Sequence, residues 1–148
     1  MEVKSKYLLV IKVCSYFSIC LQSDLSNFST SKVTDMSYMF YECGSLSQID
    51  LRRFNTENVT IMNFMFGDCY SLINLDVSSF NTAKVTDMLG MFNRCENLKS
   101  LDVSGFETKN VTSMTVIFSC CESLKELDLG MWDLSALKAD NGMFGNMP

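Results

Sequence analysis

The chain has 148 residues, the length of one ordinary domain and enough to bury a hydrophobic core. Hydrophobic residues make up 47% and charged residues 20%, a balance that argues against disorder. The net charge of −5 argues against a nucleic-acid partner, and the absence of histidine removes the commonest general base and every histidine-ligated metal site.

The first 23 residues differ from the rest of the chain. An apolar run at positions 7–21 follows Lys4 and Lys6 and contains Lys12, so it is too short and too interrupted for a membrane-spanning helix. Two interpretations stay open for residues 1–23. They form either an N-terminal cap on the domain that follows or a weak signal-like segment that would be cleaved near Cys20.

From Asp24 onward the sequence repeats every 26 residues without insertions. Cysteine, phenylalanine, Val-Thr and Met-Phe recur at this step; the cysteines are Cys43, Cys69, Cys95 and Cys121. We therefore predict one repeat domain over 24–148, with units 24–49, 50–75, 76–101 and 102–127 and a partial unit 128–148. A 26-residue period lies in the range of leucine-rich repeats, about 20–29 residues.

Each unit predicts one short strand and one short helix. In the strand half, Leu75 and Val77 would point inward and Asp76 outward. In the other half, apolar residues are spaced three to four apart, which is typical of one helix face, as in Val33, Met36, Met39 and Cys43. The helix N-caps would be Thr34, Thr60, Thr86 and Thr112. The predicted fold class is an α/β solenoid, a leucine-rich-repeat-like stack of 26-residue coils.

The repeat resembles that of the BspA-type leucine-rich-repeat surface proteins. The shared pattern is L-x-x-L-D-[LV]-S-x-F-x-T-x-x-V-T-x-M-x-x-M-F-x-x-C. Its first part is seen here from Leu98 to Met114. Its last part, Met-Phe-x-x-Cys, is best preserved in the preceding unit, from Met91 to Cys95. The resemblance extends from Asp24 to about Phe144. It implies a cell-surface or secreted repeat domain that serves adhesion or protein recognition, with no catalytic residues to carry over. A cytoplasmic location stays open as the alternative.

The repeated cysteines are predicted to be core thiols. One cysteine per coil does not converge on a tetrahedral metal shell, and parallel Cβ directions disfavour disulfides between coils. The cysteines that lie off this column, and for which pairing or reactivity stays open, are Cys14, Cys20 and Cys120.

The outward aspartates need compensation for their mutual repulsion, since Asp50, Asp76, Asp102 and Asp128 would stack. Either calcium lies between the coils, or the carboxylates accept hydrogen bonds from backbone N–H groups and from Ser78 and Ser104; we favour the hydrogen bonds. We predict no catalytic, cofactor-binding or metal-binding residue, and no cofactor.

A binding surface should consist of residues that the repeat does not dictate. On the strand side these are Gln48, Arg52, Arg53, Asn74, Ser78, Ser100, Ser104 and Glu126. Beside the predicted helix they are the large aromatic residues Tyr38, Phe64 and Tyr70, which either anchor an interface or pack on the flank of the stack.

These observations predict a protein without catalytic activity that recognises a protein or host-surface ligand. The alternatives are a structural spacer or stalk and an intracellular scaffold fragment of a longer array. The last unit departs from the pattern at Leu134, Lys138 and Asp140, which leaves a degenerate cap or end-to-end self-association as further possibilities.

Overall fold

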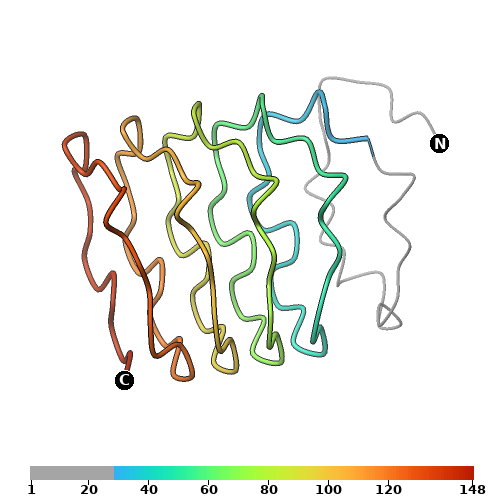
Figure 1. The fold of residues 1–148 in the computed structure, drawn as a ribbon, viewed down its shortest axis with the longest axis vertical. Coiled ribbons are helices and arrows are strands. Elements are labelled where there is room, and N and C mark those ends of the chain that lie inside the picture. Colours follow the sequence, from blue (N-terminus) through green and yellow to red (C-terminus); the bar gives the residue numbers. More distant parts are fainter. Residues whose placement is uncertain (1–28) are drawn as a thin grey trace.

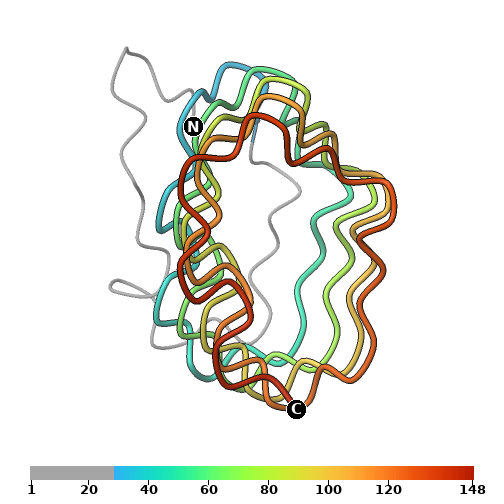
Figure 2. The same cartoon turned by 90° about the vertical axis from the view of Figure 1, so that its left-hand side faces the viewer.

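A computed structural model describes residues 29–148 as a stack of similar coils. The coils follow one another along the stack in chain order (Figure 1), and viewed along the stack they superimpose closely (Figure 2). Backbone hydrogen bonds join residues 26 apart, such as the Thr60 N–H to the Thr34 carbonyl at 2.8 Å and the Thr86 N–H to the Thr60 carbonyl at 2.9 Å. The predicted segment 1–23, with its alternatives of cap and signal, lies outside the described residues.

The predicted α/β solenoid is wrong, because residues 29–148 contain no helix and no strand longer than an isolated bridge. The predicted strand half contributes a single parallel bridge, between Asn74 and Ser100. Within the predicted helix half, the bridges are also parallel and pair Asp35 with Ile61, Ile61 with Asp87, Asp87 with Ser113, and Ser113 with Ala139.

The segment predicted as a helix is a run of tight turns. In the third coil the N–H groups of Met91, Asn93 and Cys95 each donate to the carbonyl three residues back, at 3.2, 2.9 and 3.2 Å. The N–H groups of the residues between them, Phe92 and Arg94, donate to carbonyls of the next coil at 3.0 and 2.8 Å. A helix would direct every N–H four residues back within its own segment. Here every second N–H binds the neighbouring coil, so pairing between coils replaces the helix.

Two left-handed residues per coil make this run of turns possible. In a type II turn of four residues, the third residue has positive φ, and the chain reverses without a helical hydrogen bond. Most of these positions are not glycine. Along the stack they are Tyr38 and Glu42, Phe64 and Asp68, Gly90 and Arg94, Val116 and Cys120, and Gly142 and Asn146.

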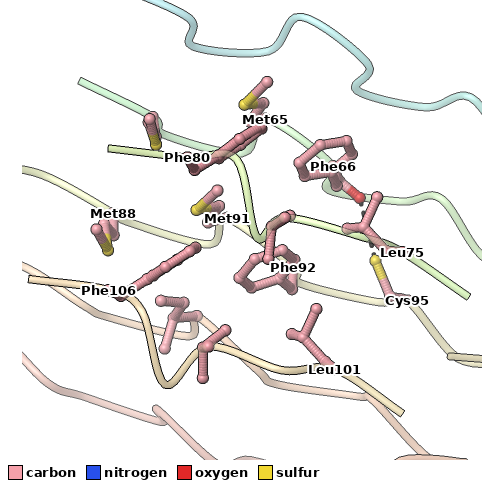
Figure 3. Close-up of a cluster of buried hydrophobic side chains, with 14 of the residues drawn as sticks. Met65, Phe66, Leu75, Phe80, Met88, Met91, Phe92, Cys95, Leu101 and Phe106 are labelled. Atoms are coloured by element: carbon pink, nitrogen blue, oxygen red, sulfur yellow. Dashed lines mark hydrogen bonds between the residues drawn. The ribbon is translucent and has the colours of Figure 1, made fainter. Parts of the chain in front are cut away.

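The core consists of columns of repeated side chains, as predicted. Figure 3 shows Met65, Met91, Phe66 and Phe92 among the packed layers. The phenylalanine rings of successive coils stack: Phe66 lies 5.9 Å from Phe92, and their ring planes differ by 1°. The predicted alternation is also confirmed, because Leu75 and Val77 are buried on either side of the exposed Asp76. The repeated apolar residues therefore stabilise the stack rather than a site.

Two columns of threonine hydroxyls form hydrogen bonds with the backbone of a neighbouring coil. The buried Thr82 hydroxyl donates to the Glu107 carbonyl at 3.2 Å and accepts from the Glu107 N–H at 2.7 Å. The threonines predicted as N-caps have another role, because no helix is present to cap: the Thr86 hydroxyl donates to the Thr60 carbonyl at 3.2 Å. The buried column satisfies backbone groups that have no other backbone partner among residues 29–148, whereas the exposed column adds a second donor to carbonyls that already accept a backbone N–H.

Candidate functional site

One candidate surface is the aspartate face, the side of the stack that carries the outward aspartates and their variable neighbours. All the predicted binding residues of this side are exposed: Gln48, Arg52, Arg53, Asn74, Ser78, Ser100, Ser104 and Glu126. The surface also includes Ile73, an exposed apolar side chain that the sequence reasoning missed. The sequence did indicate that this position is exposed, since the equivalent residues of the next two coils are Lys99 and Lys125.

The aspartates on this face cap their own turns. Asp76 accepts hydrogen bonds from the N–H and the hydroxyl of Ser78 at 3.0 and 2.6 Å. Asp50 accepts from the Arg52 N–H at 3.0 Å and pairs with its guanidinium at 2.7 Å. The hydrogen bonds from the Arg52 side chain and N–H lower the pKa of Asp50 to about 2, and those from Ser78 lower the pKa of Asp76. These carboxylates are held ionised, which suits a cap.

The same caps continue along the aspartate column. Asp102 accepts from the Ser104 N–H at 2.9 Å and Asp128 from the Gly130 N–H at 2.8 Å, so the predicted hydrogen bonds are present. Across residues 29–148, no three His, Cys, Asp or Glu side chains group closely enough to hold a metal ion.

The second candidate surface is the aromatic patch of the first two described coils, which comprises the mutually packed rings of Tyr38, Tyr41 and Phe64 and the ring of Tyr70, which lies against Gly44. The rings of Tyr38 and Phe64 stack at 5.5 Å with a 14° angle between their planes. Tyr41 lies edge-on to both, at 5.3 Å from Tyr38 and 5.9 Å from Phe64. Phe64 is half-buried against its neighbours, as the packing alternative predicted, whereas Tyr38 and Tyr70 are 37% and 43% exposed.

Glycines of adjacent coils make room for these rings. A Cβ atom at Gly44 would overlap the Tyr70 ring, and one at Gly90 would overlap the Phe64 ring. Tyr41 was missed from the sequence. The sequence does distinguish it, because the equivalent positions of the four other described coils hold small or polar residues: Gly67, Asn93, Ser119 and Gly145.

Three cysteines of the column carry inert core thiols, whereas Cys43 is disulfide-bonded, so the prediction of a core thiol is wrong for Cys43. Cys69, Cys95 and Cys121 are fully buried, and each donates to a phenylalanine carbonyl of the preceding coil, at 3.0, 3.2 and 3.2 Å. Burial raises the pKa of Cys69 and of Cys121 to about 12. The half-buried Cys120 lies off the column and accepts a 3.5 Å hydrogen bond from Asn146. Cys14 and Cys20 lie outside the described residues.

The fold and these surfaces define a repeat protein built of stacked coils, with a uniform core and two variable outer surfaces. The chain belongs to a family described as "Mycoplasma protein of unknown function, DUF285", whose model matches residues 9–99 and again 71–148. No curated protein and no solved structure matches the chain. Within residues 29–148, no helix is long and apolar enough to cross a membrane.

Proposed function

We propose that this chain is a non-catalytic recognition protein that binds a protein or host-surface ligand through exposed residues that differ from coil to coil. One observation carries the proposal: the repeat is uniform where side chains are buried and variable where they are exposed. The buried Phe66, Phe92 and Phe118 are identical, whereas the exposed column on the aspartate face reads Gln48, Asn74, Ser100 and Glu126.

The chemical state of the ionisable groups supports a role without catalysis. Perturbed pKa values in an enzyme cluster at the reacting site. Here each strongly perturbed group has a structural cause: burial raises the thiol pKa of Cys69, and the hydrogen bonds from Ser78 lower the carboxyl pKa of Asp76. Neither change prepares a nucleophile or a general acid near neutral pH.

The resemblance to BspA-type repeats supports adhesion at the cell surface, or recognition by a secreted protein, as the setting of this binding. Detection of the full chain at the cell surface or in secreted material would agree with that setting. Its recovery from the cytoplasm alone would favour the scaffold alternative.

Binding by the purified 148-residue chain tests the proposal. We expect saturable binding to at least one protein of an array of extracellular-matrix and host-surface proteins, measured by biolayer interferometry. A scrambled-surface chain, with the exposed variable residues permuted among coils and every buried column kept, is the matched control and should fold but lose that binding. Absence of binding across the array, or equal binding by the control, would contradict recognition and leave the spacer alternative.

A further inference from the structure

The outer surface differs between the two ends of the stack. In the columns that line the flank and the adjoining corner, aromatic residues occur only in the first two described coils. Read in coil order, these columns are Tyr38, Phe64, Gly90 and Val116; Tyr41, Gly67, Asn93 and Ser119; and Gly44, Tyr70, Glu96 and Glu122. The repeat does not require these aromatics, because the same backbone forms without them two coils later.

The stack holds the aromatic patch in place before any partner arrives. Phe64 is fixed between the stacked Tyr38 ring and Gly90, and Tyr70 lies against Gly44. Both tyrosines nevertheless keep more than a third of their surface exposed. Rigid aromatic side chains that are already ordered lose little entropy when they bind, which is the property of an interface anchor.

Within the segments that carry the rings, all the charged residues are acidic. Residues 35–49 and 61–75, which contain all four rings, include Asp35, Glu42 and Asp68 but no lysine or arginine. The cation that approaches from the third coil, Arg94, is already engaged with Asp68 at 3.0 Å. Burial, the hydrogen bond to Asp68, and the negative charges of Asp68 and Glu42 raise the pKa of Tyr41, in agreement with a negative local potential.

We infer that the aromatic patch is the docking surface for a protein partner that places arginine or lysine side chains on Tyr38 and Tyr70. A cation of this kind lays its apolar stem along an aromatic ring and its charge near the exposed Glu42 carboxylate. The inference rests on the proposed recognition function and names the surface and the chemistry of the partner. The aspartate face suits this partner less well, since the exposed cations Arg52 and Arg53 lie on it.

The test uses the full chain and random peptides displayed on phage, selected for binding to it. The affected variant is Tyr38→Ser/Tyr70→Ser, which changes two exposed side chains outside the core. Its control is Gln48→Ser/Asn74→Ser, which changes two exposed side chains of the aspartate face. We expect peptides enriched in arginine or lysine that bind the affected variant at least about tenfold more weakly, the loss typical of an interface anchor, and the control as they bind the parent chain.

A second variant keeps the inference falsifiable if the tyrosine changes disturb folding. Glu42→Gln removes one exposed carboxylate and leaves every ring in place. We expect a severalfold loss of affinity for the basic peptides, smaller at high salt because screening already weakens the attraction.

Three results would overturn the inference. Peptides that bind the affected variant unchanged would move the site elsewhere, and loss of binding in the control would place it on the aspartate face; in both cases the recognition function would survive. Selected peptides without basic residues would contradict the chemistry of the partner. Selection of no peptide, together with no binding to the protein array, would overturn both this inference and the proposed function.

Discussion

The buried threonine column gives a quantitative test of how the coils are held together. In Thr82→Val a methyl group replaces the hydroxyl at nearly constant volume, so packing is retained. The change leaves both the N–H and the carbonyl of Glu107 without their partner, which lies at 2.7 and 3.2 Å in the parent chain. Each unsatisfied group costs about 1–3 kcal/mol, so we expect the free energy of unfolding to fall by about 2–6 kcal/mol.

The matched control is Thr86→Val, four residues along the same coil. The Thr86 side chain is exposed and makes a single 3.2 Å hydrogen bond, to the Thr60 carbonyl, where water can replace it. We expect a loss below about 1 kcal/mol for this change. Urea titration of both variants, with equal slopes, measures the difference. If Thr82→Val cost no more than Thr86→Val, the buried hydroxyls would not hold the coils together.

Three further predictions address the core, the backbone and the acid limit. Cys69→Asp buries a charge without a partner, so we expect it to lose the cooperative melting transition. The control Cys69→Ala should retain that transition. An unchanged melting curve for Cys69→Asp would refute the inward placement of this side chain. Val116→Asn replaces a branched residue at φ 50 by one that tolerates the left-handed region. Urea titration should show that the free energy of unfolding rises by about 0.5–1 kcal/mol. A lower free energy of unfolding would contradict strain at this position. The pKa of Asp76 is lowered in the folded chain, so its contribution to stability is present above about pH 4 and lost as the pH falls through the lowered value. The acid-induced drop in melting temperature should therefore be smaller in Asp76→Asn, and an equal drop would refute the cap.

Part of the candidate surface was predictable because exposure follows from the repeat. Once the buried columns are assigned, the residues between them must lie outside, and Gln48, Asn74 and Ser100 are exposed for this reason. The arrangement of the aromatic patch was not predictable. That Tyr41 lies edge-on to Tyr38 and Phe64, and that Phe64 lies over Gly90, depends on side chains reaching between coils, which no spacing within one unit specifies.

The spacing of the repeated residues was enough to predict the 26-residue register and the side of the coil on which each column lies. Met88, Phe92 and Cys95 are buried as their spacing indicated. That spacing did not determine the backbone, because a helix and a run of tight turns both bring residues three to four apart to one side. The tertiary structure decided between them: an N–H such as that of Phe92 finds its acceptor in the next coil, a partner that exists only after the coils have stacked. The left-handed conformation of Arg94 was likewise not predictable from the sequence, because the residue is not glycine.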